Sequence, residues 1–400
     1  MRAMDDGGSG AHAAPRRRLR VAMVTETYPP EINGVAVTMA HLVSGLCRRG
    51  HEIQIVRPRQ MRNETPARRP GCEEVLVPGV PIPRYDALKL GLPAKRTLRA
   101  LWSRERPDIV HVVTEGPLGG SALTAARELG LPVSTDFHTN FHAYTGHYGV
   151  GWLKKPVTAY LRRFHNRALC TMVPTPGLRE ELAALGFENL AIVARGVDTR
   201  LFSPARRSAA LREAWGAAPA DVVALSVGRV APEKNLPLVM ETYEAMRRAR
   251  PGTRLVVVGD GPVRRRLQSS HPLPIFAGMR TGEDLAAHYA SADVFLFPSV
   301  TETYGNVTIE ALASGLAVVA YDHAAAAVHI RSGENGLTAP FGDRARFIRL
   351  AVDLLDRPAE IVRLGSSART TAESIDWADV VSEFEDALTH LATGRAARGI

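Results

Sequence analysis

The chain has 400 residues, of which 45% are hydrophobic and 23% charged, and its formal net charge is +9. This length exceeds one hydrophobic core and predicts two domains of a globular protein. Its three cysteines form no C-x-x-C pair, which argues against a disulfide scaffold or a zinc site and fits a reducing cytoplasm. The basic charge attracts anions, whether phosphates, nucleotides, nucleic acid or acidic lipid.

Residues 1–18 are predicted to form a disordered basic extension that ends in Arg16, Arg17 and Arg18. The segment has no apolar region of the kind that a secretory signal needs. No run of 18 apolar residues predicts a membrane-spanning helix anywhere in the chain. We therefore expect a cytoplasmic protein.

From residue 19 onward, short apolar runs alternate with stretches of helical periodicity, which predicts repeated βα units and parallel sheets. The first series occupies residues 19–200. The helix that follows its first strand is expected to end at Gly50. The strand candidates of this series are LRVAMVT, EIQIVRP, EEVLVPG, RPDIVHVVT, LPVSTDFH, CTMVPT and AIVARGV.

The second series occupies residues 201–375, and a polar, proline-containing linker is placed at 197–210. Its strand candidates are DVVALSVGRV, TRLVVVGDG, LPIFAGM, ADVFLFPS and LAVVAYD. Each series is long enough for its own doubly wound α/β domain. An amphipathic helix is predicted at 376–392, with an apolar face formed by Trp377, Val380, Val381, Phe384 and Leu388.

Two loops between a strand and a helix contain candidate phosphate-binding residues. The first includes Gly34 but lacks the G-x-G-x-x-G fingerprint, which disfavours a nicotinamide or flavin domain. On this motif alone, an ordinary turn between strand and helix is the favoured interpretation. The second, GRVAPEKN, places Arg229 and Lys234 before a helix N-terminus, where a diphosphate binds well. A pair of surface cations is the alternative interpretation of this second loop.

A third loop, PSVTETYGNVTIE, combines carboxylates with a glycine. Glu302 is expected in the loop and Glu310 about one turn into the helix, and carboxylates accept hydrogen bonds from sugar and ribose hydroxyls. Gly305 allows a close approach of the backbone. The amides of Asn306 and Val307 are then free to donate to a phosphate or sugar oxygen.

In this order the motifs resemble the retaining glycosyltransferases of family four, which have the GT-B fold. The resemblance covers roughly residues 19–392. It implies two Rossmann-like doubly wound domains that face a central cleft, with the last helix crossing back to the N-terminal domain. Tyr304 departs from the family pattern, in which phenylalanine is commoner. The matching stretches are ETYPPEINGVAVT, DFHTNFHAYTGHYG, SVGRVAPEKN, VVVGDGP, FAGM, SADVFLFPSVTETYGNVTIEALASGLAVVA and ENGL.

The resemblance implies a nucleotide-sugar donor whose diphosphate is held by Arg229 and Lys234, which also stabilise the leaving group. Glu302 binds hydroxyls of the donor sugar and Glu310 binds the ribose. No metal or cofactor is implied, because the two cations replace the charge of a metal. The other implied site residues are His138 near the reaction centre, Gly34, Gly305, Asn306 and Val307 near the diphosphate and sugar, and Asp260, Gly261 and Met279 near the base.

The runs STDFHTNFHAYTGHYGVGWL and TETYGNVTIEALASG are most similar to bacterial α-mannosyltransferases. This likeness implies GDP-mannose as the donor and a lipid or glycan as the acceptor. Some sulfoquinovosyl- and glucosyltransferases share the runs, so a UDP-sugar donor stays open. A sugar epimerase of the same fold is another alternative. A nucleic-acid-binding protein is disfavoured, since the sequence contains no RNA-recognition aromatics, zinc finger or basic helix with heptads.

A basic segment of the first series predicts peripheral contact with an anionic membrane. A packed helix with a solvated basic face explains the same pattern. The cations are Lys154, Lys155, Arg162, Arg163 and Arg167, beside Trp152, Leu153, Val157, Tyr160 and Leu161, together with Lys95, Arg96 and Arg99, beside Leu98, Leu101 and Trp102.

Overall fold

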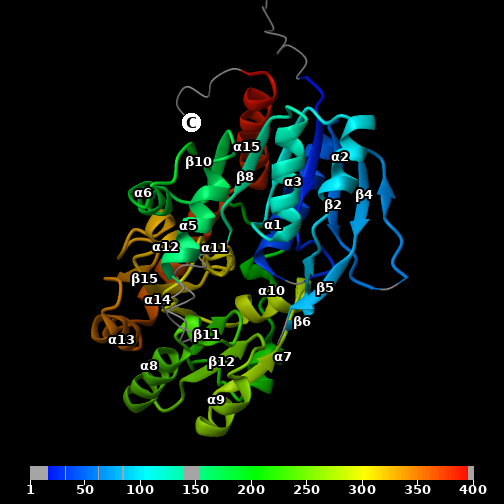
Figure 1. Ribbon diagram of the computed structural model, residues 1–400. Helices are drawn as coiled ribbons and strands as arrows, with labels where there is room; N and C mark the ends of the chain where they lie inside the picture. Colours follow the sequence, from blue (N-terminus) through cyan, green and yellow to red (C-terminus); the bar gives the residue numbers. More distant parts are fainter. Residues whose placement is uncertain (1–16, 32, 62, 83–84, 139–153, 395–400) are drawn as a thin grey trace, which may run out of the picture.

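A computed structural model describes residues 17–394, apart from 32, 62, 83, 84 and 139–153. The chain forms two α/β units, one on each series of strands (Figure 1). Of the predicted extension only the last two residues are described, and they contact the first unit: Arg17 pairs with Asp108 at 2.9 Å and Arg18 with Glu52 at 3.0 Å. Within the described residues, no helix has the length and apolar character to cross a membrane.

The first unit contains an eight-stranded sheet in the order β10-β9-β8-β7-β1-β2-β4-β3, parallel except at the β3–β4 edge. Its strands are β1 (Arg20–Val24), β2 (Glu52–Pro58), β3 (Arg68–Arg69), β4 (Cys72–Val77), β7 (Ile109–Val112), β8 (Val133–Asp136), β9 (Cys170–Val173) and β10 (Leu190–Ile192). A separate antiparallel hairpin joins β5 (Gly79–Ile82) to β6 (Tyr85–Gly91). The predicted strand AIVARGV ends early, at Ile192, because the chain then leaves the sheet toward the second unit.

Helices cover both faces of this sheet, as a doubly wound unit requires. Helix α1 packs on one face, while α2 and α3 pack on the other. The side chain of Asn33 caps α1 by accepting from the amide of Ala36, and Gly50 follows the helix with φ of 88°. The helices are α1 (Gly34–Arg48), α2 (Lys95–Arg104), α3 (Pro117–Glu128), α5 (Lys154–His165) and α6 (Pro176–Ala184).

The second unit contains a six-stranded, wholly parallel sheet in the order β13-β12-β11-β14-β15-β16. Its strands are β11 (Val223–Val227), β12 (Arg254–Val258), β13 (Ile275–Gly278), β14 (Val294–Phe297), β15 (Ala317–Tyr321) and β16 (Leu337–Ala339). Its helices are α7 (Ala209–Ala214), α8 (Leu236–Ala249), α9 (Arg264–Ser270), α10 (Gly282–Ser291), α11 (Asn306–Ala313), α12 (Ala324–His329), α13 (Arg344–Asp353) and α14 (Pro358–Glu373), with 3₁₀ turns at Pro204–Arg206 and Pro232–Lys234. Every residue of β11 and β15 is buried, because helices cover both faces.

The last helix, α15 (Trp377–Ala392), packs in the first unit and not in the second, as the red helix beside the blue and cyan elements of Figure 1 shows. Its Phe384 is fully buried in the same core cluster as Leu19 and Met39. Gly45 of α1 permits the close approach of the two helices, since a Cβ there would lie 2.5 Å from Val381. Buried Glu385 accepts from Arg49 at 2.6 Å and contacts His51 at 2.9 Å.

Two segments therefore cross between the units, and they lie side by side. The amide of Val197 donates to the carbonyl of Ile375 at 3.0 Å. A Cβ on Gly196 would lie 2.7 Å from the backbone nitrogen of Trp377, so a larger residue at 196 would push the crossings apart. The domain boundaries set at residues 200 and 375 stay predictions.

Candidate active site

The loop after β11 brings Arg229 and Lys234 to one small cavity at the carboxyl edge of the second sheet. Arg229 forms an ion pair with Glu233, whose side chain is fully buried. Lys234 forms an ion pair with Glu302, which follows the neighbouring strand β14. The hydroxyl of Ser299 also donates to Glu302, at 2.6 Å. The structure thus brings three of the predicted donor residues together.

The electrostatics of this cluster keep Glu302 ionised. Burial raises the pKa of Glu302, but the charge of Lys234 and the hydrogen bonds from Lys234 and Ser299 lower it, and the net pKa lies below the ordinary value. Each cation therefore has a carboxylate against it. A bound diphosphate would give both cations a second anionic partner, with more oxygens to accept their N–H groups.

Two helix N-termini converge beside the cluster, one from each unit. Gly305 has φ of 92°, which favours glycine, and places Asn306 at the start of α11. The amides of Asn306 and Val307 have no carbonyl one turn earlier to accept from them. A Cβ on Gly34, the first residue of α1, would lie 3.5 Å from the side-chain nitrogen of Asn306. Such converging helix ends favour an anionic ligand.

Glu310 lies below this edge, in the second turn of α11. The hydroxyl of Tyr289 donates to its carboxyl group at 2.8 Å. Burial raises the pKa of Glu310 to about 7, although the Tyr289 hydrogen bond lowers it. The group therefore titrates close to neutral pH, and in either form it accepts a hydroxyl donor.

The loops expected near the base lie on the other side of Arg229, after β12 and β13. Asp260 accepts from the amide of Gly261 at 2.7 Å and pairs with Arg264 at 3.0 Å. A Cβ on Gly261 would lie 2.4 Å from the carbonyl of Val230, so only glycine fits there. The Met279 side chain is 52% exposed and stays available to a ligand.

His138 follows β8 in the first unit and touches the Glu302 loop of the second. Its carbonyl accepts from the Thr303 hydroxyl at 2.9 Å. Its ring is buried, with Nε2 at 2.8 Å from an oxygen of Asp136 and Nδ1 at 3.2 Å from a nitrogen of Arg195. The Tyr304 hydroxyl donates to the carbonyl of Arg195 at 3.1 Å. Sequence reasoning missed Asp136 and Arg195, although a charged residue within an apolar run, as in LPVSTDFH and AIVARGV, was a usable signal.

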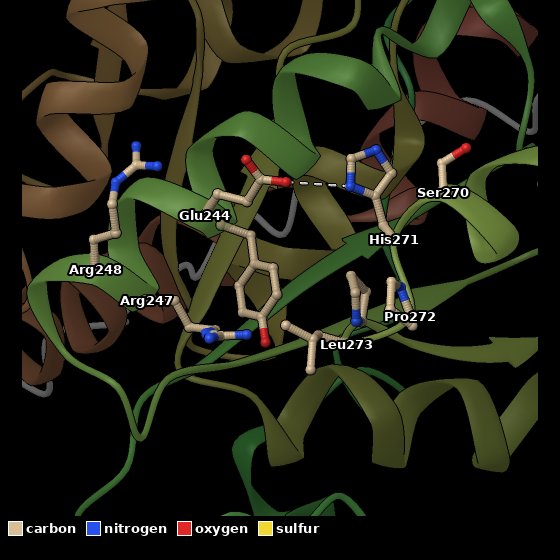
Figure 2. Close-up of a pocket in the computed structure, with 9 residues that line it drawn as sticks. Glu244, Arg247, Arg248, Ser270, His271, Pro272 and Leu273 are labelled. Atoms are coloured by element: carbon tan, nitrogen blue, oxygen red, sulfur yellow. Dashed lines mark ion pairs between the residues drawn. The ribbon is translucent and has the colours of Figure 1, made fainter.

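A larger hollow lies elsewhere in the second unit and contains none of the predicted donor residues. It measures about 340 Å³ and lies between the end of α8 and the segment before β13 (Figure 2). Arg247 and Arg248 line it, and Glu244 pairs with His271 at 3.3 Å. The carboxyl end of a helix disfavours anions. Helix α8 begins two residues after Lys234, and Arg247 lies in its last turn. At 1.5 Å of rise per residue, this hollow is roughly 16 Å from the end of α8 that adjoins Lys234.

The basic segment predicted to contact membranes has a different apolar face from the one expected. Leu98, Trp102 and Leu161 are buried in the protein core and cannot meet lipid. Tyr160 is 51% exposed, and its hydroxyl donates to the carbonyl of Glu115. Trp152 and Leu153 lie outside the described residues. The cations with exposed side chains are Lys95, Arg96, Arg99, Lys155, Arg162, Arg163 and Arg167.

Comparison with known proteins matches both units to glycosyltransferase models. Residues 32–201 match Glycosyltransferase Family 4, and residues 221–357 match Glycosyl transferases group 1. A GDP-mannose-dependent alpha-mannosyltransferase of Mycobacterium tuberculosis is 35% identical over 92% of this chain and 95% of its own. A sulfoquinovosyl transferase of Arabidopsis thaliana is 29% identical over 90% of this chain and 71% of its own.

Among solved structures, sucrose-phosphate synthase from Thermosynechococcus elongatus shares the fold, with a TM-score of 0.78 and 18% identity over 94% of this chain and all of that one. The predicted α/β architecture of two parallel-sheet domains is thereby confirmed. The chain is an enzyme of the GT-B fold and belongs to the glycosyltransferases of family four.

Proposed function

We propose that this enzyme transfers mannose from GDP-mannose to a hydroxyl of a lipid or glycan acceptor, with retention of the anomeric configuration. One observation carries the choice of donor: the 35% identity, over nearly the whole of both chains, to a protein named for its use of GDP-mannose. The sulfoquinovosyl relative is less similar, at 29%, and supports a UDP-sugar only as the alternative.

In this proposal Arg229 and Lys234 bind the donor diphosphate. The bond between the sugar C1 and the phosphate oxygen breaks, so negative charge grows on the diphosphate while the two cations lie against it. Glu302 and Glu233, which pair with these cations, share them with the incoming phosphates. The amides of Asn306 and Val307 donate to the phosphate or sugar oxygens from the helix end.

The carboxylates bind hydroxyls in this scheme, and none acts as a nucleophile. Glu302 is already engaged by Lys234 and Ser299, which suits a group that positions the sugar. Glu310 accepts from the ribose. The acceptor oxygen attacks C1 on the face that the diphosphate leaves, and its proton passes to a phosphate oxygen of the leaving diphosphate. His138 lies against the Glu302 loop and orients the reaction centre.

We also propose peripheral contact between the first unit and an anionic membrane. The support is the set of exposed cations on α2 and α5. With most of the neighbouring apolar residues buried, the attraction is chiefly electrostatic and weakens with salt. The Arg162→Glu/Arg163→Glu variant should lose co-sedimentation with anionic liposomes, while the matched Arg265→Glu/Arg266→Glu variant of the second unit keeps it. Equal binding by both variants would refute this contact.

The donor is tested by titrating the purified protein with GDP and with UDP, followed by a panel of nucleotide sugars assayed for free nucleotide and for transfer. Preference for GDP, with mannose transferred to an extracted lipid fraction, supports the proposal. Binding and turnover with UDP-sugars alone would replace the donor and leave the family unchanged. Release of an epimerised sugar from the donor without any acceptor would point to an epimerase.

A further inference from the structure

The ring of His138 is enclosed by charged groups on both of its nitrogens. Nε2 lies 2.8 Å from an oxygen of Asp136, and Nδ1 lies 3.2 Å from a guanidinium nitrogen of Arg195. All three side chains are nearly inaccessible to solvent, with exposed fractions of 5%, 1% and 3%. Glycosyl transfer releases a proton from the acceptor, and a histidine near the reaction centre is the usual candidate to accept it.

The chemistry of the two neighbours fixes where the ring proton lies. A guanidinium group has only N–H donors, so Nδ1, which faces Arg195, must present its lone pair. A neutral ring whose Nδ1 accepts carries its hydrogen on Nε2, which lies 2.8 Å from an oxygen of Asp136 at an angle outside hydrogen-bond geometry. This arrangement is the neutral tautomer with hydrogen on Nε2. Neither nitrogen is then free to take a proton from an acceptor hydroxyl.

The surrounding charges favour the same state. The Arg195 guanidinium lies 3.9 Å from an oxygen of Asp136, and its charge favours the ionised carboxylate even when the His138 ring is neutral. Burial lowers the pKa of His138 most, Asp136 raises it, Arg195 lowers it, Glu115 raises it slightly, and the net pKa lies below 6.5. Arg195 remains protonated at any physiological pH. Asp136 therefore stays anionic and the His138 ring stays neutral.

Arg195 also links this ring to the donor side of the enzyme. It lies on the first crossing segment, and its carbonyl accepts from the Tyr304 hydroxyl, while Thr303 donates to the carbonyl of His138. Tyr304 in turn lies 2.8 Å from Nε2 of His329 on α12. Arg195 thus contacts the His138 ring through its side chain and the Glu302 loop through its backbone carbonyl.

We propose that Arg195 is a positioning residue for glycosyl transfer: together with Asp136 it holds the His138 ring as one neutral tautomer, so that His138 shapes the reaction centre and accepts no proton. The inference rests on the proposed place of His138 at the reaction centre. The acceptor proton then leaves with the diphosphate, and Arg195 contributes geometry, not charge stabilisation of the leaving group.

The direct test is ¹⁵N NMR of the wild-type protein labelled at histidine, with the His138 signal assigned by a His138→Gln variant. We expect the shifts of a neutral ring protonated at Nε2, unchanged from pH 6.5 to pH 8. An imidazolium signal in this range, or a ring protonated at Nδ1, would overturn the proposal. This measurement needs no donor, acceptor or catalytic turnover.

Variants separate positioning from a merely structural role. Arg195→Met frees Nδ1 and removes a positive charge, while Asp136 stays beside Nε2, so the ring should protonate more readily as the pH falls. We expect kcat about tenfold lower at pH 7.5, an unchanged affinity for GDP, and a ratio of variant to wild-type kcat that falls further at acid pH. Arg195→Lys, which keeps one donor and the charge, should recover part of the rate.

Arg57→Met is the matched control, because Arg57 is also a buried arginine of the first unit but pairs with Glu64 and Glu74, away from His138. The ratio of the kcat of Arg57→Met to the kcat of the wild type should not depend on pH. An Arg195→Met variant that behaves like Arg57→Met would refute the positioning role. If Arg195→Met does not fold, the wild-type NMR result decides the question alone. Absence of transfer by the wild type from every nucleotide sugar would count against the proposed function and leave the tautomer result standing.

Discussion

Replacing Glu310 by glutamine should stabilise the protein at neutral pH while weakening its donor site. The carboxyl group is largely buried, and its only hydrogen-bond donor among the described residues is Tyr289. Burial raises its pKa from 4.5 to about 7. A glutamine side chain can accept the same hydrogen bond through its amide oxygen and carries no titratable proton.

The sign and size of the effect follow from the two pKa values. Below pH 4.5 the carboxyl group is protonated in both the folded and the unfolded chain, so its ionisation does not affect stability. As the pH rises toward 7, the unfolded chain ionises and the folded one resists, so the free energy of unfolding falls and then levels off. At about 1.36 kcal/mol for each pKa unit the full loss is on the order of 3 kcal/mol, most of which falls between pH 5 and pH 8. These are upper figures, because the side chain keeps some contact with water.

The assay is urea unfolding followed by circular dichroism at several values of pH, for the wild type, Glu310→Gln and a control. Glu213→Gln serves as the control, because Glu213 is an exposed glutamate of α7 in the same unit. The stability difference between Glu310→Gln and the wild type should grow by about 2 to 3 kcal/mol at most from pH 5 to pH 8. A difference that stays constant with pH, as expected for the control, would refute the buried-carboxyl argument.

Three further outcomes follow from the site. Lys234→Ala should lower transfer about 10- to 100-fold with an unchanged circular dichroism spectrum, since it removes a charge-assisted phosphate contact; near-normal turnover would mean that the phosphate site is misplaced. Transfer should persist in excess EDTA, because Arg229 and Lys234 supply the positive charge, and a loss restored by manganese would contradict this. Tyr304→Phe should lower the free energy of unfolding in urea by at least about 1 kcal/mol, through loss of the hydrogen bonds between its hydroxyl and Arg195 and His329; unchanged stability would contradict a stabilising role for this hydroxyl.

Buried strands and motif-bearing loops were predictable from the sequence because their signals are local. The strands β11, β14 and β15 are uninterrupted apolar runs, since helices cover both faces of their sheet. The strand β16 was missed because three residues give no periodicity to recognise. The hairpin of β5 and β6 was missed as well, and Pro81 within it argues against a strand.

The residues of the candidate site also fall into those that the sequence predicts and those that it does not. Arg229, Lys234 and Glu302 were found because each lies in a recognisable loop after a strand. The partnership of His138 with Arg195 joins residues 57 positions apart, on segments whose contact depends on the path of the chain between the units. Likewise, a sequence pattern does not reveal that the fully buried Glu233 neutralises Arg229.

The return of α15 to the first unit has a consequence for how the protein is made. On the ribosome, the strands and helices of residues 19–192 emerge before the second unit, yet one wall of their core is supplied by Val381, Phe384 and Leu388, which follow the second unit in the sequence. The second unit is continuous in sequence and can close its core as soon as α14 emerges. The first unit is therefore completed after the second, and until α15 emerges the apolar face of α1 stays uncovered and exposed to aggregation or to chaperones.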